Sequence, residues 1–296
     1  MTKLKAYAKI NLGLRIIGKR EDGYHNIETI YHRINLCDEI ILEPSLSITI
    51  MCDNISVPSN ENNLCFRAAK LLQQYCNIDS GVYIKLIKNI PVGAGLGGGS
   101  SDAAATLLGL VKIWNLGINK NKLHELALQL GSDVPYFLKE GTAYATGRGE
   151  ILDYFKFDIP YWIVLVYPNI NISTSWAYQS FYDSRFKRHE SNLKPQTSKS
   201  SLKQILLSNI QRPQELNHLL HNDFEPIILH THESIAYIKV SLYAAGAKFA
   251  QMSGSGSAVY GLFGSQQEVN SVLDKFGRHY QIFITAPNFQ AEKQII

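Results

Sequence analysis

The first recognisable element of the chain is a stretch in which apolar and polar residues alternate. From residue 4 to residue 16 the even positions are apolar, whereas the odd positions, apart from Tyr7 and Gly13, are charged or carry an amide. A period of two predicts a long half-buried strand with one polar face. Side chains two residues apart on a strand share a face, so Lys9 and Asn11 are expected to line one cleft. Taken alone, the two residues fit a solvated strand face equally well.

Periodicity predicts a mixture of strands and helices for the rest of the first half. Strand patterns lie at residues 27–36, 39–43 and 82–87, helix patterns lie at 64–75 and 120–130, and a glycine-punctuated hairpin pattern lies at 141–149. Gly131 is expected to close the second helix. Asp133 then stands at the start of a new helical turn, where a carboxylate ordinarily complements a helix dipole.

The second half begins with an apolar run at residues 161–168 that is typical of a central strand. The elements expected after it are helices at 173–181 and 235–245, strands at 247–252 and 258–263, a helix at 266–276 and a strand at 281–286. The order strand, helix, strand, strand, helix, strand is that of a ferredoxin-like α+β layer. We therefore predict two domains, residues 1–156 and 157–296.

A glycine-rich stretch follows the strand pattern at 82–87 and is the strongest chemical signal. Five of seven positions are glycine, namely Gly93, Gly95, Gly97, Gly98 and Gly99. Such a backbone bends sharply and turns several N–H groups toward one anion. A helix is expected from residue 100 to residue 114, with Ser100, Ser101 and Asp102 as capping residues in its first turn. The positive end of this helix would then point into the loop.

The glycine letters alone leave the ligand open. They fit G-x-G-x-x-G, but no acidic residue follows at the distance of ~20 residues that a dinucleotide site needs. A Walker phosphate-binding loop is excluded because Gly99 stands where its lysine must be. A protein kinase is excluded because the motifs V-A-I-K, H-R-D and D-F-G do not occur. A flexible loop without a ligand is the remaining alternative, although such linkers rarely join a strand to a capped helix.

Composition narrows the class of protein. A chain of 296 residues that is 45% hydrophobic suits a two-domain enzyme, and its net charge of +4 suits small anionic substrates better than nucleic acid. No apolar run approaches the ~18 residues that span a bilayer, and the N-terminus lacks the apolar core of a signal peptide, so a cytoplasmic protein is expected. The four cysteines lack metal spacing and are read as reduced thiols. The basic segment 183–201 is interpreted as a mobile surface insertion.

Three stretches together resemble the GHMP small-molecule kinases, which are named for galactose, homoserine, mevalonate and phosphomevalonate. They are Ala8-Lys9-Ile10-Asn11-Leu12, the stretch from Pro91 to Ala105, and the stretch from Met252 to Ser257. Three further motifs narrow the resemblance to the kinases of 4-diphosphocytidyl-2-C-methyl-D-erythritol in the non-mevalonate isoprenoid (MEP) pathway. These are Asp22-Gly23-Tyr24-His25, Gly131-Ser132-Asp133-Val134-Pro135 and Gly97-Gly98-Gly99-Ser100-Ser101.

The resemblance implies a fold and a set of roles. The fold is the α+β two-domain GHMP kinase fold, with an N-terminal domain like domain 2 of ribosomal protein S5 and a ferredoxin-like C-terminal domain. Lys9 and Asp133 take the catalytic positions. ATP is implied in a loop made of Pro91, Val92, Gly93, Ala94, Gly95, Leu96, Gly97, Gly98, Gly99, Ser100 and Ser101.

The resemblance also implies how the second substrate and the metal are held. Tyr24 and Tyr178 would sandwich the cytosine, His25 would read its edge, and Asn11 would hold the methylerythritol end. Gly254 and Gly256 of the second glycine loop complete the substrate site. Mg²⁺ is expected to enter with ATP, near Ser101 or Asp102, without a dedicated protein site. Many relatives carry asparagine where Asp102 stands, so this extra charge is expected to act through Mg²⁺ or as a helix cap.

The sequence thus predicts transfer of the γ-phosphoryl group of ATP to the 2-hydroxyl of 4-diphosphocytidyl-2-C-methyl-D-erythritol, giving the 2-phosphate and ADP. A GHMP kinase of the homoserine or mevalonate type is one alternative, although it would not need Tyr24, His25 and Tyr178 to hold a base. A non-catalytic nucleotide-binding or RNA-binding module is another, and the basic segment is its only support. No nucleic-acid or membrane partner is expected, and the chain is predicted to be a monomer or a homodimer.

Overall fold

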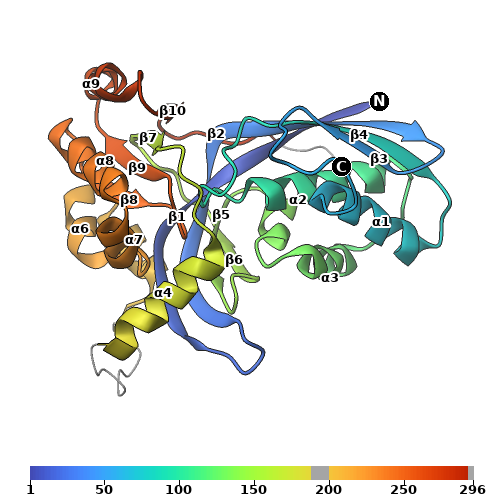
Figure 1. Cartoon of the computed structure of the whole chain (residues 1–296), viewed down its shortest axis with the longest axis horizontal. Helices are drawn as coiled ribbons and strands as arrows, with labels where there is room; N and C mark the ends of the chain where they lie inside the picture. Colours follow the sequence, from blue (N-terminus) through green and yellow to red (C-terminus); the bar gives the residue numbers. More distant parts are fainter. Residues whose placement is uncertain (188–199, 293–296) are drawn as a thin grey trace.

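The structure is a computed structural model that describes residues 1–187 and 200–292 (Figure 1). Part of the basic segment, residues 188–199, therefore lies outside the described residues. Within the described part, no helix is both long enough and apolar enough to cross a membrane. The described residues form two sheets with helices packed against them.

The first sheet is built around one long hairpin. Its strands are β1 (Thr2–Lys19), β2 (His25–Ser45), β3 (Thr49–Cys52), β4 (Gly81–Ile87), β5 (Thr142–Thr146) and β6 (Ile151–Phe155). The path runs β3-β4-β2-β5-β6, and β1 pairs antiparallel with the other edge of β2. Figure 1 shows this hairpin passing between the two halves of the molecule, with its tip beside α4. It thus carries the Lys9 region to the junction of the two halves.

Two predictions for this hairpin are wrong. The stretches 27–36 and 39–43 form one strand, because Asp38, which interrupts the apolar alternation, is fully buried and accepts hydrogen bonds from the N–H groups of Asn89 and Ile90. The polar face expected for β1 is also absent at its centre, where Lys9 and Asn11 are only 4% and 2% exposed. The glycine loop and the second half cover this face.

Helices cover one face of the first sheet. They are α1 (Leu64–Cys76), α2 (Gly98–Ile113), α3 (Lys120–Leu130) and the short 3₁₀ helix η1 (Val134–Leu138). Their apolar residues share one core with the sheet. The predicted helices at 64–75 and 120–130 are confirmed. Helix α2 begins two residues earlier than expected.

The second sheet confirms the ferredoxin-like order. Its strands β7 (Trp162–Tyr167), β8 (Phe249–Met252), β9 (Val259–Phe263) and β10 (Gln281–Thr285) are arranged β10-β7-β9-β8, with α8 (Glu233–Ala244) and α9 (Gln266–Phe276) as the two connecting helices. A longer excursion separates β7 from α8. It contains α4 (Thr174–Lys187), α5 (Leu202–Asn209), η2 (Pro213–Glu215), α6 (Leu216–Leu219) and α7 (Glu225–Thr231).

One apolar cluster joins the two halves. Ile10 and Ile30 of the hairpin pack in the same core as Leu165 of β7 and Tyr260 of β9. Leu96 of the glycine loop belongs to this core as well. Since the core contains the loop and both sheets, it holds the loop in a defined place between them.

A buried ion cluster ties the start of the glycine stretch to α2. The ammonium of Lys88 lies 2.8 Å from Oδ2 of Asp102 and also contacts Oδ2 of Asp38. All three side chains are at most 4% exposed. Two carboxylates therefore share one cation inside the protein, an arrangement that is costly to disrupt because either carboxylate alone would be a buried unpaired charge.

We predict that Lys88→Met lowers the free energy of unfolding by about 3–5 kcal/mol, as measured by urea denaturation. Burial raises the pKa of Asp102, Lys88 opposes that rise and Asp38 adds to it. Without Lys88 the folded chain retains a proton that the unfolded chain releases, so the deficit is largest at about pH 8 and shrinks toward about pH 5. As a control, Lys203→Met breaks the exposed pair with Asp153 and costs only about 0–1 kcal/mol. Equal losses in the two variants would contradict the prediction.

Candidate active site

A cavity of about 1220 Å³ lies where the hairpin, the glycine loop, α4 and the second glycine loop meet. This volume exceeds what one drug-sized ligand usually needs, so it has room for two small molecules. The predicted site residues that line it are Lys9, Asn11, Tyr24, His25, Pro91, Val92, Gly93, Ala94, Gly95, Leu96, Gly97, Gly98, Gly99, Ser100, Asp133, Tyr178 and Gly254. Ser101 and Gly256 are not among the residues that line it.

The glycine loop is shaped by close approach of the second half. Gly93, Gly95 and Gly97 have left-handed φ values of 67°, 77° and 69°, which residues with a side chain adopt only under strain. A Cβ on Gly95 would lie 2.1 Å from the carbonyl oxygen of Ser253, and one on Gly93 would lie 1.7 Å from Oδ1 of Asn171. At these positions glycine is therefore required both by backbone conformation and by contact.

The expected caps of the helix after this loop are not used. Helix α2 begins at Gly98 with Gly97 as its N-cap, and no side chain caps it. Ser101 instead donates to the carbonyl of Tyr7 at 2.8 Å, and Asp102 pairs with Lys88. The first-turn N–H groups thus have no side-chain cap, and the positive end of the helix faces the cavity, an arrangement suited to a phosphate group.

Lys9 and Asp133 meet on the wall of the cavity. Nζ of Lys9 lies 3.8 Å from Oδ2 of Asp133 and donates to Oδ1 of Asn11 at 2.5 Å and to the carbonyl of Gly95 at 3.1 Å. The ammonium is thus directed both at the carboxylate and at the glycine loop. Burial lowers the pKa of Lys9, and the neighbouring Asp133 opposes that shift.

Two further contacts orient this pair. The hydroxyl of Tyr31 donates to Oδ1 of Asp133 at 3.0 Å, and burial raises the pKa of that hydroxyl well above its usual value. On the other side, the amide of Asn11 donates to the hydroxyl of Thr29 at 2.8 Å, which leaves its Oδ1 toward Lys9. Asp133 does not cap η1 with its side chain, and its carboxylate contacts Tyr31 and Lys9 instead.

Aromatic residues form the outer end of the cavity. The His25 ring stacks on Tyr178, with centroids 4.3 Å apart and an interplanar angle of 10°, and also on Tyr182 at 4.9 Å. Burial lowers the pKa of His25, and Lys19 adds to the effect. Tyr24 is 52% exposed, and the guanidinium of Arg148 lies 4.5 Å from the centre of its ring. The structure thus brings His25, rather than Tyr24, against Tyr178.

The second glycine loop closes the cavity floor. Gly254 has φ of 56°, and a Cβ there would lie 3.1 Å from Oδ1 of Asn11 and 3.5 Å from Nζ of Lys9. Gly256 is packed differently, since a Cβ at that position would lie 2.6 Å from the sulfur of Met252. Gly254 is therefore adjacent to Lys9 and Asn11, whereas Gly256 packs against Met252, which precedes the loop.

Sequence reasoning missed Tyr31, Tyr182 and Arg148, and it placed Ser253 in the second glycine loop without giving it a role. Tyr31 belongs to no recognisable motif in the sequence, but it pairs with Asn11 across the hairpin. Had the register of the hairpin been known, the pairing of Tyr31 with Asn11 would have placed Tyr31 at the site. The opposite end of the cavity is lined by Val57, Pro58, Leu64 and Leu86, which also carry no signal of their own.

Comparison with known proteins places the chain in a family. Sequence models described as "GHMP kinases N terminal domain" and "GHMP kinases C terminal" match residues 63–141 and 201–282. The 4-diphosphocytidyl-2-C-methyl-D-erythritol kinases of Chlorobium phaeobacteroides (strain BS1) and Prosthecochloris aestuarii (strain DSM 271 / SK 413) are 44% and 43% identical to the chain, and each alignment covers 97% of both chains. The chain belongs to the GHMP kinase family.

A solved structure supports the same assignment. The crystal structure of a 4-(cytidine 5'-diphospho)-2C-methyl-D-erythritol kinase superimposes on this GHMP kinase with a TM-score of 0.77 and 29% identity. The match covers 97% of this chain and all of the other. The predicted GHMP kinase fold and the prediction of a small-molecule kinase are confirmed.

We predict that Tyr31→Phe lowers kcat of this GHMP kinase about 10- to 100-fold, because it removes a hydrogen bond to a carboxylate worth about 1.5–3 kcal/mol. Steady-state kinetics on folded protein would measure the loss. Tyr136→Phe is the matched control. Its ring lies 5.0 Å from that of Tyr31, but its hydroxyl donates to the carbonyl of Gly141, so kcat should not change. Equal effects would show that Tyr31 acts through packing.

Proposed function

We propose that this chain transfers the γ-phosphoryl group of ATP to the 2-hydroxyl of 4-diphosphocytidyl-2-C-methyl-D-erythritol, giving the 2-phosphate and ADP, as a step of isoprenoid precursor synthesis. One observation carries the proposal. The Lys9–Asp133 pair lies beside an uncapped helix N-terminus, within one cavity large enough for two substrates. The names of the relatives support the choice of substrate.

In this proposal the phosphates of ATP lie in the loop from Gly93 to Ser100. Backbone N–H groups and the helix dipole of α2 would hold them, and Lys9 would stabilise the charge on the transferring group. The base and ribose would then extend toward Val57, Pro58, Leu64 and Leu86, which offer apolar surface at that end.

Asp133 is proposed as the group that receives the proton of the 2-hydroxyl. Its Oδ1 already accepts a hydrogen bond from Tyr31, so Oδ2, which faces Lys9, is the oxygen available to the substrate. Lys9, whose ammonium lies 3.8 Å from Oδ2, would orient this carboxylate. Phosphoryl transfer requires mainly in-line positioning and charge neutralisation, and these groups provide both.

The aromatic end is proposed to hold the cytosine. Tyr178 and Tyr24 both line the cavity, with His25 stacked on Tyr178 and Arg148 over Tyr24, while Nε2 of His25 is buried without a hydrogen-bond partner among the described residues. A cytosine edge would satisfy that nitrogen. A homoserine or mevalonate kinase would have no base to place there. This end of the cavity therefore favours the cytidine substrate over those alternatives.

Mg²⁺ is proposed to enter with ATP, where it neutralises charge on the phosphates. Of the two residues predicted near it, Ser101 donates to the carbonyl of Tyr7, whereas Asp102 borders the cavity and its buried Oδ1 has no hydrogen-bond partner within residues 1–187 and 200–292. A carboxylate oxygen is a hard ligand that suits Mg²⁺. Asp102 is therefore the residue that fits, and no wholly protein-made site is needed.

A non-catalytic binding module is the weaker candidate. Such a module would have no need to bury an ammonium against a carboxylate, since burial of charge is costly unless it serves a purpose or is well paired. Lys9 and Asp133 are both present and are brought together by distant elements.

We predict that Asp133→Asn lowers kcat about 10²- to 10⁴-fold, because the amide cannot accept the hydroxyl proton. A coupled assay of ADP release with the cytidine substrate would measure this loss, and fluorescence titration would test whether both substrates still bind. Asp153→Asn, which changes an exposed carboxylate, serves as control and should be as active as the parent. Unchanged turnover with intact binding would rule out the proposed role of Asp133.

We predict that Tyr24→Ala raises KM for the cytidine substrate about 10-fold and leaves KM for ATP nearly unchanged, because stacking on a base contributes about 1–3 kcal/mol. Initial rates with each substrate varied in turn would provide both constants. Tyr75→Ala is the matched control, since Tyr75 is also half-exposed and also lies under a cation, that of Lys122. Equal increases for ATP and the cytidine substrate would assign Tyr24 a structural role.

A further inference from the structure

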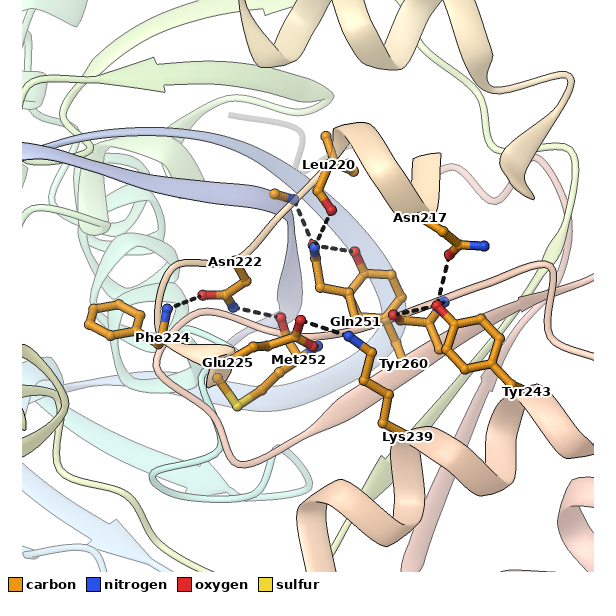
Figure 2. Close-up of polar contacts among 12 residues, drawn as sticks. Asn217, Leu220, Asn222, Phe224, Glu225, Lys239, Tyr243, Gln251, Met252 and Tyr260 are labelled. Atoms are coloured by element: carbon orange, nitrogen blue, oxygen red, sulfur yellow. Dashed lines mark hydrogen bonds and ion pairs between the residues drawn. The ribbon is translucent and has the colours of Figure 1, made fainter. Parts of the chain in front are cut away.

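A buried polar network lies behind the second glycine loop, outside the cavity (Figure 2). At its centre is Asn222, which is 2% exposed and lies between α6 and α7. Its amide nitrogen donates to the carbonyls of Met252 and Gly254 at 2.9 and 2.8 Å, and its oxygen accepts from the N–H of Phe224 at 3.0 Å. Both N–H hydrogens of this amide therefore form hydrogen bonds with backbone carbonyls at the start of the loop.

The segment around Asn222 is also attached to β1. The N–H of Leu14 donates to the carbonyl of His221, the N–H of Asp223 donates to the carbonyl of Leu14, and the N–H of Ile16 donates to Oδ2 of Asp223, at 2.8, 2.9 and 2.7 Å. These bonds begin three residues after Asn11. The segment 221–223 therefore fixes the distance between the strand that carries Lys9 and the loop that carries Gly254.

The loop held in this way contacts the reacting groups. The hydroxyl of Ser253 donates to the carbonyl of Gly95 at 2.9 Å and accepts from the N–H of Asn11 at 3.2 Å. Gly254 packs against Asn11 and Lys9 so closely that a Cβ there would approach both. A small shift of the loop would therefore move the carbonyl and the amide that hold the Lys9 ammonium.

Neighbouring groups brace the strands on either side of the loop. Oε1 of Gln251 accepts from the N–H of Gly13 at 2.8 Å, and the hydroxyl of Tyr260 donates to the carbonyl of Asn11 at 3.0 Å. Glu225 accepts from the N–H of Met252 and from Lys239, both at 2.7 Å. Figure 2 shows side chains from the α6–α7 segment, α8 and β9 converging on Gln251 and Met252 of β8. Asn222 also reaches the loop itself, because its amide donates to the carbonyl of Gly254.

We propose that Asn222 is a positioning residue for phosphoryl transfer. By holding the carbonyls of Met252 and Gly254, it keeps the second glycine loop seated on Asn11 and Gly95, and so keeps Lys9 in place opposite Asp133. Asn222 does not line the cavity and touches neither substrate in this proposal, which rests on the proposed roles of Lys9 and Asp133.

Two variants test this role. Asn222→Asp keeps the size of the side chain but turns an oxygen toward two carbonyl oxygens, which removes both hydrogen bonds and repels the loop. Asn222→Ser is the gentler change, because a serine hydroxyl can still accept from the N–H of Phe224 in an ST-turn but does not reach the loop. Both variants are expected to lower kcat about 10- to 100-fold, the effect of a displacement of about 1 Å at the reacting groups. KM for ATP and for the cytidine substrate should stay within about twofold.

Asn217→Ala is the matched control from the same network. Asn217 donates to the carbonyl of Lys248 and accepts from the hydroxyl of Tyr243, so it is a similar amide that does not contact the loop (Figure 2). This variant should lower the thermal unfolding temperature as much as Asn222→Ser and leave kcat of the folded fraction unchanged.

The outcomes separate this inference from the proposed function. If the parent chain fails to phosphorylate the cytidine substrate, the proposed function is wrong. The positioning role is wrong if the parent is active and the Asn222 variants keep the parental kcat or change only KM. It is also wrong if these variants fail to fold or if their kinetics match those of Asn217→Ala. A fall in kcat at constant KM in folded Asn222→Ser, with Asn217→Ala unaffected, supports it.

Discussion

The buried ammonium of Lys9 is the constraint on which the site depends. A cation at this depth is stable only if oxygen atoms surround it, and here Asp133, Asn11 and the carbonyl of Gly95 supply them. Each comes from a different part of the chain: a helical turn, the same strand and the glycine loop. The requirement to neutralise one charge therefore brings three segments together. The same neighbours leave the ammonium facing the place where transferred phosphate would lie.

The glycine loop is defined by its neighbours as much as by its own residues. On one side its backbone bonds to β1, where the N–H of Lys9 donates to the carbonyl of Leu96 at 3.0 Å. On the other side the carbonyl of Ala94 accepts from the N–H of Ala258, and that of Gly93 accepts from the N–H of Ile172. A loop held from both sides is ordered before any phosphate arrives, which lowers the entropy that binding would otherwise lose.

The parts of the fold that follow from local pattern were predictable from sequence. Strand β1, helices α1 and α3 and the ferredoxin-like order depend on periodicity and were predicted correctly. The errors arose where tertiary contacts override local preference. Asp38 interrupts the apolar alternation and so looked like the end of a strand. It lies inside β2 instead, because Lys88 and the N–H groups of Asn89 and Ile90 compensate its buried charge.

The site shows the same division. The glycine stretch, Lys9 and Asp133 carry recognisable local motifs, so sequence alone indicated them. Tyr31 and Asn222 do not, because the first acts through strand register and the second through two backbone carbonyls thirty residues or more away. Ser101 and Asp102 suit a helix cap by residue type, but β1 and Lys88 bind them more favourably.

The core shared by the two halves has a consequence for how the chain matures during synthesis. Domains of a growing chain generally fold as they emerge, the N-terminal part first. Here Lys9 and Gly95 are made before Ser253 and Gly254, which pack against them, and Ser253 follows Gly95 by 158 residues. The pocket is therefore incomplete until the second glycine loop has been synthesised and has packed against β1 and the first glycine loop.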